Sequence, residues 1–188
     1  MEVRRLFGIL VAGLCVLGST ALASASEWQV DQASSSIAFT ASQGGNEIKG
    51  SFDSWSAEIR FDPDALSEAQ ISASVELGSV KTGTSQIESA LASAEWFNAS
   101  AFPQAVFTST SVKPGPDGGY VLNGELSLKG IVLPVTLPFS LEIDGDKAVA
   151  EGTVELMRDA FKIGEGTSAG QVALPVNVQL HIEATRVP

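Results

Sequence analysis

The chain has 188 residues, of which 22 are Asp or Glu and 11 are Lys or Arg, so its formal charge at pH 7 is −11. A single His and a single Cys exclude a zinc or copper site built from several His and Cys ligands, and they exclude an intrachain disulfide. Apolar residues make up 44% of the chain and charged residues 18%, which excludes a disordered protein, and the acidic balance excludes a nucleic-acid binder. The length suits one domain.

The N-terminal segment, residues 1–25, has the pattern of a secretory signal peptide. Arg4 and Arg5 precede a long apolar run, and small residues with Ala-x-Ala sites follow it. We expect cleavage after Ala25, which leaves a mature domain of residues 26–188. A retained membrane anchor is the alternative, and the small residues after the apolar run disfavour it.

The sequence also predicts the compartment of the mature protein. Cys15 follows Leu14 rather than a small residue, so we do not expect acylation of its thiol. Loss of residues 1–25 makes the charge one unit more negative, which disfavours docking on anionic membrane surfaces. Export without disulfides fits a bacterial periplasm. We therefore expect a periplasmic protein that is not an integral membrane protein once processed.

The first part of the mature chain alternates between apolar and polar residues, as strands with one buried face do. Three runs have this pattern: Ile37, Phe39 and Ala41; Ala57, Ile59 and Phe61; and Ile71, Ala73, Val75 and Leu77. The turn-forming sequences Gly44-Gly45-Asn46 and Asp62-Pro63-Asp64 lie between the runs. Short connections of this kind predict antiparallel strands.

One helix is predicted after these strands. Ser85 and Glu88 have the spacing of a capping box, and apolar residues follow at helical spacing. We expect a short helix from about Gln86 to Ala94, followed by the pair Trp96-Phe97. No linker, long repeat or low-complexity segment interrupts the mature sequence, which predicts a single domain.

The second half of the chain returns to strand patterning. Apolar residues alternate through Leu122 to Leu128, Val135 to Ile143 and Val154 to Leu156. The longest run extends from Val172 to Ala184, where every second residue is apolar. These runs favour strands that each place one face on a core or cavity.

About eight such strands can form either a sandwich or an up-and-down barrel. The long alternating runs favour the barrel, so we predict an all-β fold: an antiparallel, eight-stranded barrel with one short helix. Small residues such as Ala57 and Ala73 alternate in the inward rows with large ones such as Phe61 and Phe139. An eight-stranded barrel with this mixture can hold one small ligand.

Short motifs occur in a characteristic order along the chain. They are Trp28-Gln29-Val30-Asp31, Ser36-Ile37-Ala38-Phe39, Gly50-Ser51-Phe52, Ile59-Arg60-Phe61-Asp62, Ser79-Val80-Lys81-Thr82-Gly83, Glu95-Trp96-Phe97-Asn98, Phe102-Pro103, Val106-Phe107, Gly124-Glu125-Leu126-Ser127-Leu128-Lys129-Gly130 and Pro134-Val135. Each motif alone is weak, but the ordered set is specific. From Glu27 to Thr185 the chain resembles the YceI-like, polyisoprenoid-binding family.

The resemblance implies a lipocalin-like antiparallel barrel, secreted in bacteria, that holds a long isoprenoid chain such as a polyprenyl lipid or a quinone tail. The implied function is that of a periplasmic binding or carrier protein. Two positions depart from the family pattern. Ser35 stands where many members have His, and the late Arg-x-x-Phe-x-Ile motif survives as Arg158, Phe161 and Ile163 with altered residues between them.

A long apolar cavity alone can supply affinity for such a chain, because each buried CH₂ contributes roughly 0.8 kcal/mol. Ordinary packing in a barrel filled by side chains is the alternative for every candidate. The candidate lining residues are Phe39, Phe52, Val75, Phe107, Leu126, Phe139, Leu156 and Phe161.

Three further residues are candidates for contact with the head of a ligand. Trp96 and Phe97 follow the predicted helix, where a lid would cover the barrel mouth, although they could instead anchor the helix to the barrel. Arg158 could hold a polar head group, or it could form an ion pair with Asp159 or Glu155.

Two other functional classes stay open. An enzyme acting on an isoprenoid or lipid would need a coupled pair of carboxylates facing the cavity, and the inward rows contain none. There is no G-x-S-x-G motif, and His181 lies on an outward face. A ligand-free structural or stress-response protein would have a filled barrel. We therefore expect no catalytic residue, metal or cofactor, an isoprenoid lipid or quinone as partner, and no nucleic acid, and we leave homodimer formation open.

Overall fold

The protein is built from eleven strand segments and one α-helix within residues 25–166 and 170–188, the part of the chain that the computed structural model describes. The segments are β1 (Glu27–Val30), β2 (Ser36–Gln43), β3 (Asn46–Phe52), β4 (Trp55–Arg60), β5 (Gln70–Glu76), β6 (Val80–Lys81), β7 (Gln104–Pro114), β8 (Tyr120–Leu128), β9 (Ile131–Asp144), β10 (Lys147–Met157) and β11 (Pro175–Arg186). The α-helix is α1 (Ser85–Ala92), and the 3-10 helices are η1 (Leu66–Glu68), η2 (Leu77–Ser79), η3 (Pro116–Gly118) and η4 (Arg158–Phe161). Residues 1–24 of the predicted signal peptide, 1–25, lie outside the described residues.

The eleven segments make eight strands because three strands are interrupted. Both β1 and β2 pair with β11, with Trp28 opposite Arg186 and Phe39 opposite Val178, so they form one broken strand. The residues between β3 and β4 break a second strand, since β3 pairs with β2 while β4 pairs with β1. A third strand contains β5 and β6, which are separated by η2.

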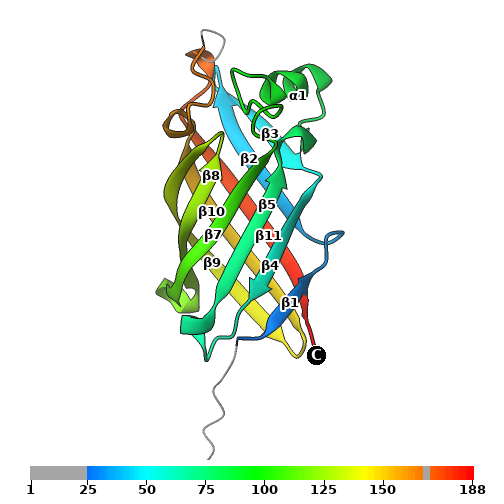
Figure 1. Ribbon diagram of the computed structural model, residues 1–188, viewed down its shortest axis with the longest axis vertical. Helices are drawn as coiled ribbons and strands as arrows, with labels where there is room; N and C mark the ends of the chain where they lie inside the picture. Colours follow the sequence, from blue (N-terminus) through cyan, green and yellow to red (C-terminus); the bar gives the residue numbers. More distant parts are fainter. Residues whose placement is uncertain (1–24, 167–169) are drawn as a thin grey trace, which may run out of the picture.

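These strands form a closed antiparallel ring. The order is β1-β4-β5-β7-β8-β9-β10-β11, and β1 pairs with both β4 and β11, which closes it. The barrel is elongated, with α1 at one end, termed the helix end, and the C-terminus at the other, termed the base (Figure 1). Closure gives each of the eight strands a neighbour on both sides over part of its length. The predicted eight-stranded antiparallel barrel is confirmed, and the sandwich alternative is wrong.

The helix differs by one or two residues from its predicted bounds. It begins at Ser85 and not at Gln86, because Thr84 occupies the N-cap position. The Glu88 carboxylate accepts hydrogen bonds from the main-chain N–H groups of Thr82 (2.9 Å) and Gly83 (3.2 Å), before the helix. An extended conformation at Ser93 ends the helix two residues earlier than predicted. In the described part of the chain, no helix is long and apolar enough to cross a membrane.

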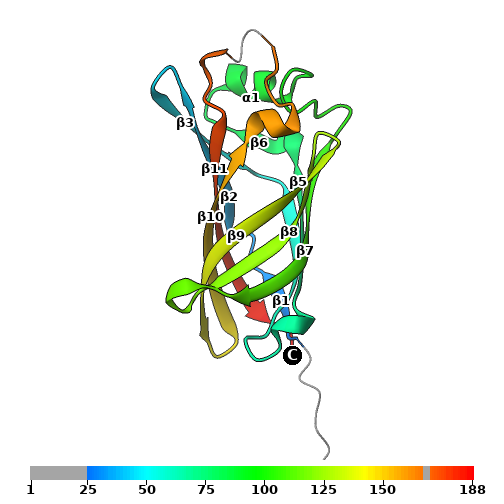
Figure 2. The ribbon, with the colours of Figure 1, turned by 90° about the vertical axis from the view of Figure 1, so that its left-hand side faces the viewer.

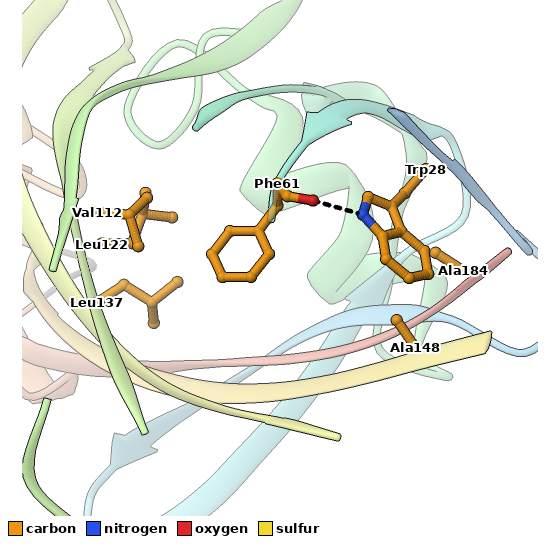
Figure 3. Packing of buried hydrophobic residues seen from close by; sticks show 7 residues of the cluster. All are labelled: Trp28, Phe61, Val112, Leu122, Leu137, Ala148 and Ala184. Carbon is orange, nitrogen blue, oxygen red and sulfur yellow. Dashed lines mark hydrogen bonds between the residues drawn. The ribbon is translucent and has the colours of Figure 1, made fainter. Parts of the chain in front are cut away.

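Two apolar clusters occupy the ends of the barrel. The base cluster consists of Trp28, Phe61, Val112, Leu122, Leu137, Ala148 and Ala184 (Figure 3). Within it, the indole N–H of Trp28 donates a hydrogen bond to the carbonyl oxygen of Phe61 at 2.9 Å, which satisfies the one polar atom of the indole (Figure 3). The helix-end cluster consists of Leu77, Ala105, Leu128, Phe161 and Ile163. The base cluster draws residues from β1 and β7 to β11, and the helix-end cluster joins β7 and β8 to η2 and η4.

Candidate ligand-binding cavity

An apolar cavity of about 240 Å³ extends through the barrel from the base cluster toward the helix-end cluster. Inward side chains of β1, β2, β4, β5 and β7 to β11 form its wall. Successive residues of a strand face opposite sides, so the alternating sequence produces an apolar interior row on every strand. The wall includes Trp28, Trp55, Ile59, Leu137, Val154 and Leu180.

The cavity exists because small residues oppose one another on neighbouring strands. Ala57 of β4 lies opposite Ala73 of β5, and Ala148 of β10 lies opposite Ala184 of β11. Gly152 adds a further position in the wall without a side chain. Large residues at these positions would fill an eight-stranded barrel completely. The mixture of small and large inward residues that the sequence contains therefore does leave a cavity.

The wall is almost without polar groups. Among the described residues that line the cavity, the one charged residue is Glu151, and its carboxylate lies on the outer surface, 3.1 Å from Nδ1 of His181. Nε2 of His181 lies 3.3 Å from the carboxylate of Glu183. These two hydrogen bonds raise the pKa of His181, the one to Glu183 contributing most. These hydrogen bonds lie on the outside of the barrel, and the described residues of the cavity wall offer a ligand apolar contact.

Five predicted lining residues are in the cavity wall: Val75, Phe107, Leu126, Phe139 and Leu156. They come from β5, β7, β8, β9 and β10, so the structure brings together residues that are up to 81 positions apart. All five are half-buried. Contact with a ligand at these positions stays a prediction, which the geometry permits.

Phe39, Phe52, Phe97 and Phe161 lie outside the cavity wall, toward the helix end. The rings of Phe39 and Phe52 are 5.8 Å apart, and those of Phe52 and Phe97 are 6.1 Å apart. Phe161 belongs to the helix-end cluster, and Phe52, Trp96 and Phe97 pack against that cluster. These aromatic residues close the helix end of the barrel.

Arg158 is buried at the helix end and binds main-chain carbonyl groups. Its guanidinium donates hydrogen bonds to the carbonyl oxygens of Val172 (2.7 Å), Ile163 (2.8 Å), Gly164 and Ala173 (both 3.0 Å). The same group lies 5.8 Å from the ring of Trp96. Arg158 thus holds η4, and the described residues that lead from η4 to β11, at the helix end of the barrel. Contact between Arg158 and a ligand head group stays a prediction.

Lys129 makes a second connection at the helix end, which the sequence did not predict. Its ammonium group donates to the carbonyl oxygens of Lys162 (2.7 Å) and Glu95 (3.1 Å). Burial lowers the pKa of Lys129, and the carboxylates of Glu165 and Glu95 partly oppose this effect. The ammonium group links the β8–β9 turn to the two segments that cover the barrel.

Trp28 and Trp55 are cavity residues that the sequence analysis did not select. Trp55 lies one period before Ala57 on the same inward row of β4, so extending that row by two residues would have found it. Trp28 belongs to the base cluster and also lines the cavity. Both indoles report on the cavity, which makes tryptophan fluorescence a probe of its contents.

Known proteins of similar sequence cover most of the chain. "Protein YceI" of Salmonella arizonae is 30% identical over 187 residues, which are 94% of this chain and 96% of the relative. A UPF0312 protein of Shewanella baltica is 32% identical over 137 residues, which are 71% of each chain.

Solved structures share the barrel. BcnA of Burkholderia cenocepacia superposes with a TM-score of 0.80 at 28% identity, covering 84% of this chain and 100% of BcnA. A polyisoprenoid binding domain from Saccharophagus degradans superposes with a TM-score of 0.68 at 15% identity, covering 87% of this chain and 99% of that domain, which shows a common fold. The family model of the YceI-like domain matches residues 28–184, from β1 into β11. The chain therefore belongs to the YceI-like family, as its ordered motifs predict.

Proposed function

We propose that this protein binds a long-chain isoprenoid lipid, either a polyprenyl lipid or the tail of a quinone, and carries it in the periplasm. The observation that carries the proposal is the apolar cavity between the two clusters. Its wall offers no inward charge among the described residues, so a charged or strongly polar molecule would lose its hydration there without a replacement partner. An apolar chain carries no polar group that would need such a partner.

The energetics suit a chain made of repeated hydrocarbon units. Each CH₂ that leaves water contributes roughly 0.8 kcal/mol, so several units in the cavity suffice for useful affinity without any polar contact. Family membership and the polyisoprenoid-binding fold neighbour support the choice of an isoprenoid. The periplasmic location rests on the signal-peptide pattern of residues 1–25.

The proposal is tested by the lipid that the protein retains. We expect mass spectrometry of organic extracts from the natively purified full-length protein to detect a prenyl lipid or quinone in stoichiometric amount. Purified protein freed of lipid should bind geranylgeraniol with a saturable change in the fluorescence of Trp28 and Trp55. Folded protein that neither retains prenyl lipid nor binds geranylgeraniol would contradict the proposal.

A cavity-filling substitution gives a sharper test. Ala73 lies opposite Ala57 and Phe107 on the two neighbouring strands, so Ala73→Phe places a ring inside the cavity. We expect the affinity for geranylgeraniol to fall at least about tenfold, equivalent to roughly 1.4 kcal/mol. The matched control is Ser56→Phe, which adds the same ring at an exposed position on β4 and should leave binding unchanged. Equal affinity in both variants would show that the ligand binds elsewhere.

A further inference from the structure

Strands β9 and β10 are paired only in the half of the barrel near the base. The ladder runs from Lys147 opposite Asp144 to Gly152 opposite Phe139, where it ends. Beyond this point β9 pairs only with β8 and β10 only with β11. The two strands diverge toward the helix end (Figure 2). We term the unpaired part, residues 131–138 and 153–157, the β9–β10 seam.

Two prolines in β9 account for the end of the ladder. Pro134 and Pro138 both lie in the seam and pair with Glu125 and Val121 of β8. A proline has no N–H, and a strand tolerates it only where the ladder does not need that donor, which is at an edge. Positions four residues apart present their main-chain groups to the same side of a strand. The two prolines therefore remove donors from one and the same side of β9, and because pairing with β8 continues through both positions, that is the side of β10.

The cavity wall extends to both flanks of the seam. The lining residues on these flanks are Val135, Leu137 and Phe139 from β9 and Gly152, Val154 and Leu156 from β10. Elsewhere most of the wall is held together by continuous ladders. At the seam, the apolar interior is separated from the outside by side chains, with no strand pairing between the two flanks.

The outer rim of the seam carries exposed apolar residues, beside the outward residues Thr136, Thr153 and Glu155. Val132 is 56% exposed, Met157 43% and Leu174 41%. Leu174 lies next to Met157, since the main-chain N–H of the following residue, Arg158, donates a hydrogen bond to the carbonyl oxygen of Leu174. In a chain with a charge of −11, the segment 131–141 has no charged residue. Val132 lies on the β9 flank and Met157 on the β10 flank, and exposed apolar side chains on both flanks beside an apolar cavity favour contact with an apolar ligand there.

The other routes into the cavity are less suited to an apolar chain. The base cluster and the helix-end cluster occupy the two ends, and Arg158 fastens the second. A second break lies between the β1–β4 pairing, which ends at Trp28 opposite Ile59, and the β2–β3 pairing, which begins at Ala38 opposite Ser51. Its rim carries exposed polar residues: Asp31, Ser34, Ser56 and Glu58.

We propose that an isoprenoid chain enters and leaves the cavity sideways through the β9–β10 seam, with Val132, Met157 and Leu174 as its outer contact surface. This inference rests on the proposed function and adds the route of exchange. A lateral route lets the polar head group of a lipid stay in water while the chain slides between the strands. No charged group then has to cross the apolar wall.

The test is a reversible block of the seam. Thr136 and Glu155 are outward residues on opposite flanks, so the pair Thr136→Cys and Glu155→Cys, in a Cys15→Ser background, allows a short bismaleimide to bridge the seam. The control pair, Glu142→Cys and Val149→Cys, bridges the same two strands where they are already paired. Uptake of geranylgeraniol and its release to lipid vesicles are followed by tryptophan fluorescence in stopped flow.

We expect the seam bridge to slow uptake and release by at least about tenfold each while the dissociation constant changes less than about threefold, because a blocked route raises one barrier for both directions. The control bridge should leave both rates unchanged. Unchanged rates in protein whose seam bridge is verified by mass would overturn the lateral route, as would equal slowing by the control. Absence of geranylgeraniol binding in every folded variant would instead refute the proposed function, and the route with it.

A second variant needs no cross-link. Met157→Lys places a charge on the exposed rim and should slow exchange several-fold without lowering the melting temperature. The control Val149→Lys places the same charge on the outer face of β10 in its paired half. Unchanged exchange in Met157→Lys would argue against Met157 as part of the contact surface and against this route.

Discussion

The ring of Phe107 reaches the cavity because position 124 on the neighbouring strand is glycine. A Cβ atom at Gly124 would lie 2.3 Å from Cζ of Phe107 and 2.5 Å from the main-chain oxygen of Thr108. Both distances are far below van der Waals contact. Any larger residue at this position must displace either the ring or the backbone of β7.

Gly124→Ala is therefore expected to lower the free energy of unfolding by about 1 to 3 kcal/mol, the usual cost of overpacking. A displaced Phe107 ring should also weaken geranylgeraniol binding. Urea denaturation measures the first effect and tryptophan fluorescence the second. Gly78→Ala is the control, since a Cβ there meets no atom within 4 Å. Equal stability of the two variants would show that the Phe107 ring adapts without cost.

His181 provides a residue-scale prediction of pH dependence. Its pKa is raised in the folded protein by hydrogen bonds to Glu183 and Glu151, so the protonated ring stabilises the fold. This contribution is fully present below the unfolded pKa of about 6.5 and is lost as the pH rises through the raised folded pKa. Because the ring is partly exposed, it amounts to about 0.5 kcal/mol or less.

The measurement compares wild type with His181→Asn in urea denaturation at pH values below and above that range. The difference in unfolding free energy between the two proteins should be larger at the acid pH. Taking the difference removes the effect of the other carboxylates, which both proteins share. The same difference at both pH values would mean that the two hydrogen bonds do not favour the protonated ring.

At the scale of elements, the helix end depends on one buried cation. Four hydrogen bonds from Arg158 hold main-chain carbonyl groups of the segment from η4 to Ala173. Buried carbonyl groups that lose a charged donor are costly to leave unsatisfied. The segment has little regular structure of its own within the described residues, so this side chain replaces the ladder that a strand would provide.

Arg158→Gln is expected to destabilise the protein by about 3 kcal/mol or more, since hydrogen bonds to a charged group contribute about 1.5 to 3 kcal/mol each. Urea denaturation gives the value. The control Arg60→Gln removes an exposed guanidinium from β4 and should change stability by no more than about 0.5 kcal/mol. If the two variants are equally stable, the carbonyl groups around Arg158 find other partners.

The sequence predicted the faces of the strands but not the height of each residue along the barrel. The period of two placed Phe139 on an inward row, and Phe139 lines the cavity. The same period put Phe39 on an inward row, yet its ring lies against that of Phe52 toward the helix end and outside the cavity wall. Height depends on the register between strands, which is set by long-range pairing and has no signature in a local pattern.

Strand interruptions were equally hidden in the sequence. The polar residues from Asp31 to Ser35 look like an ordinary turn between two strands. Only the pairing of β1 and β2 with one partner, β11, shows that they continue a single strand. The seam has a local signal in Pro134 and Pro138, but which neighbour β9 loses depends on the closed ring.

For the whole molecule, the cavity separates the core into two clusters that touch different parts of the ring. Side chains on the cavity wall lack contacts on one side, which weakens the fold relative to a filled barrel. A bound chain would restore those contacts along the length of the cavity and connect the base cluster to the helix-end cluster. Ligand binding and global stability are therefore coupled.

Geranylgeraniol at a free concentration of 100 times its dissociation constant should raise the free energy of unfolding by about 2.7 kcal/mol, since it binds the folded state alone. Thermal denaturation with and without geranylgeraniol measures the effect, and Ala73→Phe should show a much smaller shift in melting temperature. Because the described residues of the cavity wall carry no inward charge, the shift should not decrease when salt is added. For a prenyl phosphate, a part of the shift that disappears at high salt would reveal a charged contact to its head group, with Arg158 or Lys129 at the helix end as the cations to test.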